Sequence, residues 1–144
     1  MTSGILKDKL KERFSRYVRI WTTSDSAAAD NGMIPSTPGQ MTFAKMLAEE
    51  LKSMGINNAE LTGDGYVTAS IAASPSISNE KSVMFAAHID TSEEVSGKDV
   101  KPMFHENYAG ESISLQDGVV LNPADDRLLA KCAAVGDTII TSDG

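Results

Sequence analysis

The stretch SVMFAAHIDTSEEVSGKDV, residues 82–100, decides how the rest of the sequence is interpreted. Its first six residues are almost continuously apolar, which is typical of a strand buried on both faces of a sheet. The run turns polar abruptly at His88 and Asp90. Because helical patterns alternate with strand patterns along the chain, the sequence predicts an α/β fold in which these two residues lie at the carboxyl end of an interior strand.

Two helices are predicted before this strand. Residues 5–20 repeat apolar side chains at three- and four-residue intervals, the pattern of an amphipathic helix. Thr37 is placed as the N-cap of a second helix, with Pro38 at the first helical position and Gln40 completing a capping box. Gly55 marks the expected end of that helix. The small polar residues 22–35 between the two helices predict a loop.

The remaining predicted elements are short. They are a hairpin from 59–62 and 66–71, a surface loop over 73–81, two strands within 113–121 and a helix within 123–135. The final stretch TIITSDG has the pattern of a strand that enters a turn. It predicts either half of a hairpin, which leaves a sheet edge open, or a strand that pairs with a segment upstream.

Length and charge narrow the class of protein. The 144 residues predict one domain, 1–144, that can bury a core of its own. A net charge of −7 argues against a nucleic acid or an anionic membrane as the main partner. Cys132 is the one cysteine, so neither an internal disulfide nor a cysteine-based zinc cluster can form. With no apolar stretch near the ~20 residues of a membrane helix, we expect a soluble, cytoplasmic protein.

His88 and Asp90 are the candidate site residues. Side chains two positions apart on a strand point to the same face, so the imidazole and the carboxylate can converge. A neutral imidazole is a good zinc ligand, and its other nitrogen usually donates to a carboxylate that fixes the tautomer. The same pair could instead polarise a serine or act as acid and base. A histidine at a strand end is, however, more often a hydrogen-bonded structural residue than a ligand.

Other polar residues have simpler interpretations. His105 falls in a stretch that predicts a loop, where a histidine is solvated. Cys132 lies in an apolar helical context and is expected to be a small core residue. Asp125 and Asp126 stand at a helix start, where acidic residues complement the helix dipole.

Five separated motifs occur in the order and approximate spacing found in one family. They are IPSTPGQ, AAHIDTS, SGKDVKP, ENYAGESISL and TIITSDG. From about residue 10 onward the sequence resembles the peptidase T family, tripeptide aminopeptidases within the larger group of dinuclear-zinc exopeptidases. The resemblance implies the N-terminal part of a mixed-sheet catalytic domain, with helices packed on the sheet, that binds two zinc ions and acts on short peptides. It also implies that His88 ligates one zinc and that Asp90, counted as catalytic, holds the imidazole.

The motifs also indicate how much of the family's catalytic domain this chain contains. In the family, an ITTDG-like sequence leads into a Gly-Ala-Asp-Asp segment whose aspartate bridges the two metals. In this chain Asp125 and Asp126 come before TIITSDG, so they are not the equivalent of that segment. We therefore expect an incomplete catalytic domain without the lid or dimerisation domain, so that a homodimer requires the full-length protein. With one family-type ligand, His88, the chain alone is expected to be inactive.

Two other interpretations stay open. The chain could be a non-catalytic product or a subunit that pairs with a complementary polypeptide. It could also derive from a dipeptidase, carboxypeptidase or deacylase with the same metal site, although ENYAGESISL and SGKDVKP favour the tripeptidase branch.

Overall fold

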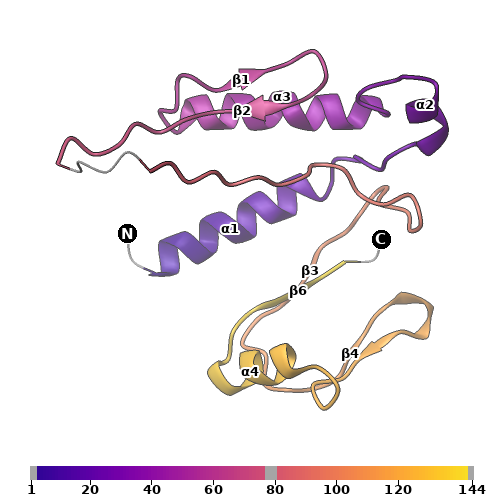
Figure 1. Ribbon diagram of the computed structural model, residues 1–144. Helices are drawn as coiled ribbons and strands as arrows, with labels where there is room; N and C mark the ends of the chain where they lie inside the picture. Colours follow the sequence, from indigo (N-terminus) through magenta and orange to yellow (C-terminus); the bar gives the residue numbers. More distant parts are fainter. Residues whose placement is uncertain (1–2, 77–80, 143–144) are drawn as a thin grey trace. The chain divides into compact units, whose positions relative to one another are not determined.

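The computed structural model describes residues 3–76 and 81–142, which form two compact units. Residues 20–97 make up the first, here called the central unit, and residues 1–19 together with 98–144 make up the second, the terminal unit. Of the predicted surface loop over 73–81, residues 77–80 lie outside the described residues. Each unit contains one helix of about four turns, α1 (Ser3–Tyr17) or α3 (Pro38–Ser53), together with short strands (Figure 1).

The central unit is organised by one long helix. Its elements are α2 (Ser26–Asp30), α3 (Pro38–Ser53), β1 (Glu60–Leu61) and β2 (Val67–Thr68), with β1 and β2 paired antiparallel. As predicted, α3 begins after Thr37, and Gln40 closes the capping box by accepting a hydrogen bond from the Thr37 N–H at 3.4 Å. Ala44 and Ala48, four residues apart on α3, are buried, and the β1–β2 hairpin packs beside this helix (Figure 1).

The prediction of a loop over residues 22–35 was wrong at one place, where α2 forms. Asp25 caps this five-residue helix, because its carboxylate accepts a hydrogen bond from the Ala28 N–H at 2.8 Å. The stretch Ser-Ala-Ala-Ala has high helix propensity, but it is too short to give a periodic apolar pattern.

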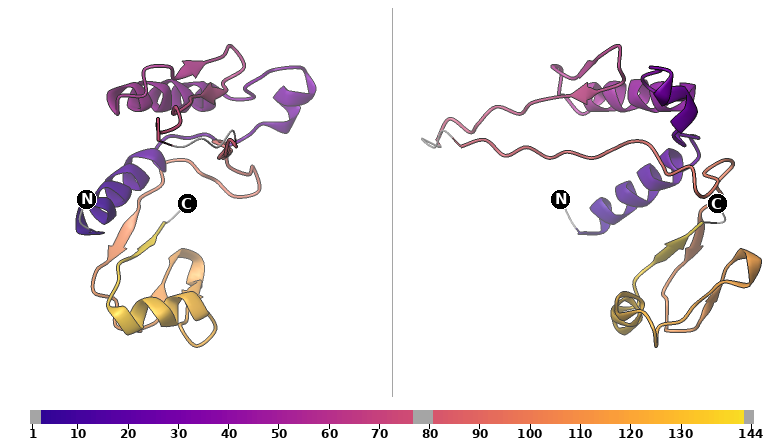
Figure 2. Two further views of the ribbon diagram at one scale, coloured as in Figure 1. Left: turned by 60° about the vertical axis from the view of Figure 1, so that its left-hand side comes forward. Right: turned by 45° about the vertical axis from the view of Figure 1, so that its right-hand side comes forward.

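The prediction of a buried strand over residues 82–87 was also wrong for this structure. The segment is extended but has no strand partner among the described residues, and Phe85 is 94% exposed. Figure 2 shows it as one of two long extended runs on either side of the undescribed residues 77–80. Among the described residues, β1 and β2 bond to each other rather than to this segment, and pairing begins only at Thr91, which forms a parallel bridge with Thr23.

The terminal unit has its own small core. Its elements are α1 (Ser3–Tyr17), β3 (Met103–His105), β4 (Ile113–Ser114), the 3-10 turn η1 (Gln116–Gly118), β5 (Val120–Leu121), α4 (Arg127–Val135) and β6 (Ile139–Thr141). Tyr108, Ile113 and Leu129 are buried together at its centre. The predicted strands within 113–121 are confirmed as β4 and β5, which pair antiparallel. The predicted helix is confirmed as α4, starting at Arg127 because Asp126 caps it.

The last strand pairs with a segment upstream, which was one of the two predicted alternatives. β6 runs antiparallel to β3, with Phe104 opposite Ile140 and His105 opposite Ile139. β3 was missed by the sequence analysis because three residues that follow a proline carry too little alternation to predict a strand.

Among the described residues, the observed elements are helices and three two-stranded antiparallel sheets, with one parallel bridge in addition. This mixture is compatible with the predicted α/β class. None of the helices within residues 3–76 and 81–142 is long and apolar enough to cross a membrane.

Candidate functional site

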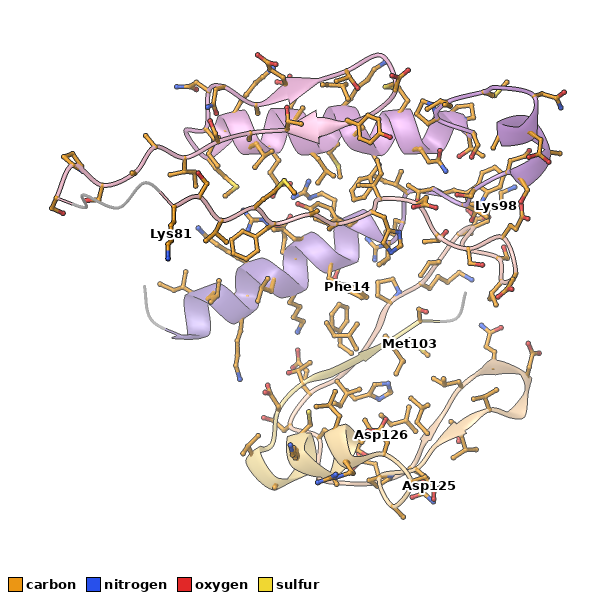
Figure 3. All side chains as sticks on the ribbon, in the orientation of Figure 1. Phe14, Lys81, Lys98, Met103, Asp125 and Asp126 are labelled. Atoms are coloured by element: carbon orange, nitrogen blue, oxygen red, sulfur yellow. The ribbon has the colours of Figure 1, made fainter. Side chains whose placement is uncertain are left out.

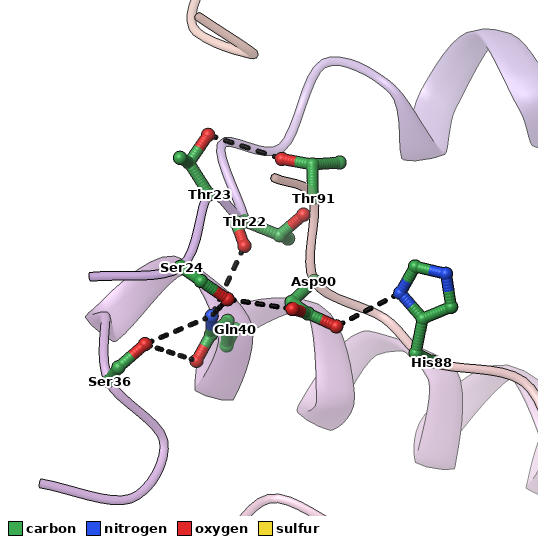
Figure 4. A network of polar contacts seen from close by, with 8 residues as sticks. All are labelled: Thr22, Thr23, Ser24, Ser36, Gln40, His88, Asp90 and Thr91. Atoms are coloured by element: carbon green, nitrogen blue, oxygen red, sulfur yellow. Dashed lines mark hydrogen bonds and ion pairs between the residues drawn. The ribbon is translucent and has the colours of Figure 1, made fainter. Parts of the chain in front are cut away.

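The structure brings the two predicted site residues together. The Nδ1 atom of His88 lies 3.0 Å from Oδ1 of Asp90, and both residues belong to the extended segment that ends at the Thr91 bridge (Figure 4). The His88 side chain is 83% exposed and that of Asp90 43%. The imidazole therefore projects into solvent, while the carboxylate beneath it is partly enclosed by protein.

Asp90 has a second partner that the sequence analysis missed. The Ser24 hydroxyl donates a hydrogen bond to Oδ2 of Asp90 at 2.7 Å, so each carboxylate oxygen is engaged. The bond from Ser24, followed by that from His88, lowers the pKa of Asp90, against the partial burial that raises it. Asp90 is therefore ionised throughout the neutral pH range.

This ionisation decides which imidazole nitrogen is available. An ionised carboxylate can only accept hydrogen bonds, so the His88 nitrogen that faces it, Nδ1, carries the proton. The lone pair then remains on Nε2, which faces away from Asp90 (Figure 4). A carboxylate–imidazole pair with a free Nε2 is the usual arrangement of a metal-ligating histidine and the group that orients it.

A buried amide stands behind Ser24. Gln40, on the first turn of α3, is 5% exposed, and its Nε2 donates to Thr22 O at 3.2 Å and to Ser24 Oγ at 3.3 Å. The first turn of α3 comes this close because residue 39 is glycine: a Cβ there would lie 1.6 Å from the carbonyl oxygen of Trp21. Gly39 thus permits the approach that places Gln40 against the Thr22–Ser24 backbone.

The described residues offer a candidate metal ligand, His88, but no complete set of ligands. No group of three or more His, Cys, Asp or Glu side chains that could hold a metal ion occurs within residues 3–76 and 81–142. A catalytic zinc has about three protein ligands and an open position. The donor chemistry of His88, a neutral imidazole with an anionic orienting group, fits one of those ligands.

The weaker sequence candidates have ordinary structural roles. His105 is partly buried on β3, and its Nε2 lies 3.1 Å from Oγ1 of Thr141 on β6, which corrects the expectation of a solvated loop histidine. Asp126 accepts hydrogen bonds from the Leu128 and Leu129 N–H groups at the start of α4 (Figure 3), as an N-cap does. Cys132 packs against the core of the terminal unit, as predicted.

Ser24 and Gln40 gave different signals in the sequence. Ser24 had none, because it lies 66 residues from Asp90 and its neighbours have the composition of a loop. Gln40 was predicted as a capping residue. That role explains why its Oε1 accepts a hydrogen bond from Thr37, but it does not explain the hydrogen bonds that its Nε2 donates. The glycine next to it was the available clue, since a glycine inside a helix start indicates a close approach of another segment.

The chain is similar to curated proteins named peptidase T from three Bacillus species. It is 41% identical to that of Bacillus thuringiensis (strain Al Hakam), 42% to that of Bacillus cereus (strain Q1) and 40% to that of Bacillus anthracis (strain A0248), over 141 residues or 96% of this chain in each case. The aligned part is 33% of each relative, so the chain spans about a third of the length of the curated relatives it matches. No family model matches the chain. The predicted resemblance to peptidase T is confirmed by these relatives.

Proposed function

We propose that this chain, a homologue of one third of peptidase T, is the N-terminal part of a zinc-dependent aminopeptidase that releases the first residue of tripeptides. The observation that carries the proposal is the contact between His88 and Asp90 within the motif AAHIDTS. It is the arrangement expected of a zinc ligand with its orienting carboxylate, and it lies in a chain whose relatives are named as peptidases.

Two residues of the chain have defined parts in this function. Asp90 holds the proton of the imidazole on Nδ1 and directs Nε2 outward, and His88 offers that nitrogen as one zinc ligand. When bound, zinc supplies the Lewis acidity that hydrolysis of a peptide bond requires. The exposure of His88 fits this role, because a ligand must be reachable by the metal and by groups from elsewhere in the complete site.

The same geometry leads us to propose that the chain alone does not hydrolyse peptides. One imidazole cannot hold zinc in a defined coordination, and the described residues offer no cluster of three ligands. The purified chain, incubated with zinc and a tripeptide, should release no more product than its His88→Ala variant. Turnover clearly above that variant would contradict this part of the proposal.

A chimera tests the function itself. The matching third of the Bacillus cereus (strain Q1) peptidase T is replaced by this chain, and release of the N-terminal residue from a tripeptide is measured with zinc present. We expect activity that is lost in the His88→Ala variant and reduced by about 10–100-fold in Asp90→Asn, because an orienting group normally contributes that much.

His105→Gln is the matched control, since it changes the other histidine of the chain, which contacts Thr141 rather than Asp90. This variant should keep the activity of the parent chimera. The proposal fails if the folded chimera is inactive, or if His88→Ala retains full activity and zinc content.

A further inference from the structure

Hydrogen bonds connect the first turn of α3 to the imidazole of His88. They run from Gln40 Nε2 to Ser24 Oγ at 3.3 Å, from Ser24 Oγ to Asp90 Oδ2 at 2.7 Å, and between Asp90 Oδ1 and His88 Nδ1 at 3.0 Å (Figure 4). All four residues belong to the central unit, although the first and last are far apart in the sequence.

The orientation of the Gln40 amide is fixed by backbone groups. The Thr37 N–H can only donate, and it lies 3.4 Å from Oε1 of Gln40. The Thr22 carbonyl can only accept, and it lies 3.2 Å from Nε2. A flipped amide would place like groups against each other at both ends, so the NH₂ group must face Ser24.

This orientation determines the direction of the next bond. Because Gln40 Nε2 donates to Ser24 Oγ, the hydroxyl accepts there and is left to donate its own hydrogen to Asp90. Each bond in the series then runs from donor to acceptor without conflict, and both oxygens of Asp90 are held. A carboxylate held at both oxygens cannot rotate away from the imidazole.

We propose that Ser24 and Gln40 are positioning residues, which hold Asp90 in the orientation that keeps the His88 proton on Nδ1 and the lone pair on Nε2. The inference rests on the proposed function, because the orientation of this lone pair matters only if His88 binds a metal. Neither residue touches the metal or the substrate in this assignment, and both act through Asp90.

The segment around the site explains why such support is needed. Residues 82–90 are extended, and no backbone hydrogen bond to other described elements fixes them before Thr91. The Thr91 bridge and the Ser24 hydroxyl are two of the contacts that attach the chain around Asp90 to residues 22–24. One of them holds the backbone, and the other holds the carboxylate.

The test measures the tautomer of His88 directly, in the chain without metal. Long-range ¹H–¹⁵N correlation spectra, recorded at alkaline pH, distinguish a proton on Nδ1 from one on Nε2. In the parent chain the proton should reside mainly on Nδ1, although a free histidine prefers Nε2. A parent chain with the proton mainly on Nε2 overturns the proposal without any variant.

Ser24→Ala should lower the ratio of the Nδ1–H to the Nε2–H form by roughly threefold or more, as expected for the loss of one hydrogen bond to a charged group. Ser24→Thr keeps a hydroxyl and should restore much of the ratio, and Gln40→Leu should act in the same direction as Ser24→Ala. Thr23→Val is the matched control: it removes the neighbouring hydroxyl, which contacts Thr91 instead of Asp90, and should leave the ratio unchanged.

The outcomes separate this inference from the proposed function. If Asp90→Asn shifts the tautomer but Ser24→Ala does not, Asp90 alone orients His88 and the positioning role of Ser24 and Gln40 is refuted, while the metal-ligand assignment stands. If Thr23→Val shifts the tautomer as much as Ser24→Ala, the effect is a general loosening of the segment, which also refutes the inference.

Discussion

The core of the terminal unit makes a quantitative prediction at Leu129. This side chain is 6% exposed and packs with Tyr108 and Ile113. Leu→Ala at a buried site removes about 2–5 kcal/mol of stability, as lost burial plus the cavity left behind. Leu115 and Leu121 also line this core but are only partly buried, so they can move into the space. We therefore expect Leu129→Ala to cost about 2–3 kcal/mol, in the lower half of that range.

The neighbouring residue provides a matched control. Leu128 lies on the same turn of α4 and is 69% exposed. Leu128→Ala should change the free energy of unfolding by no more than about 0.5 kcal/mol. Both substitutions carry the same difference in helix propensity between leucine and alanine, so the difference between the two variants reports burial alone.

Urea unfolding followed at individual backbone amides measures this difference in the free energy of unfolding. The amide peaks of Ile113 and Ala133 report the terminal unit without a contribution from residues 20–97. With a urea dependence of about 1–3 kcal/mol per molar, the midpoint should fall by roughly 0.7–3 M for Leu129→Ala and hardly at all for Leu128→Ala. Equal midpoints for the two variants would refute the described packing of α4.

Three further predictions address other elements. Phe85→Ala should leave the urea midpoint of the central unit unchanged, because the ring is 94% exposed; a loss of about 3–5 kcal/mol would indicate a buried side chain instead. Asp126→Ala should cost about 0.5–2 kcal/mol and speed amide exchange in the first turn of α4, whereas Asp125→Ala, without those hydrogen bonds to the helix start, should do neither. The hydrogen bond from Lys7, and then the one from the Thr138 N–H, lowers the pKa of Asp137 in the folded chain. The ionised carboxylate therefore stabilises the fold at any pH above its unfolded pKa. This contribution is lost as the pH falls through the lower folded pKa. Melting curves of the parent chain should therefore fall from about pH 4 downward, and Asp137→Asn should show a flatter decline; parallel curves would contradict the ion pair.

The sequence predicted those features that depend on residues close together in the chain. The start of α3 followed from Thr37 and Gln40, because the capping box lies within four residues. The contact between His88 and Asp90 followed from their spacing, since residues two apart in any extended segment share a face. This contact formed even though the predicted strand around it did not.

What the sequence could not predict depends on partners that are distant in the chain. Residues 82–87 have strand composition, but composition does not reveal whether another strand lies beside them. β3 has weak strand composition, yet it pairs because β6 lies opposite. Ser24 likewise becomes part of the site only through folding, which brings it to Asp90.

The orientation of the His88 imidazole depends on helix α3 and not on the extended segment that carries the histidine. His88 lies on a segment whose backbone forms no hydrogen bond to a described neighbour before Thr91, so the backbone of the segment does not by itself hold the imidazole in place. The rigid parts nearby are the start of α3 and the Thr22–Ser24 backbone, which Gly39 allows to meet and Gln40 joins. The orientation of the imidazole is therefore set from α3 through Ser24 and Asp90, by contacts that no pattern within residues 82–100 contains.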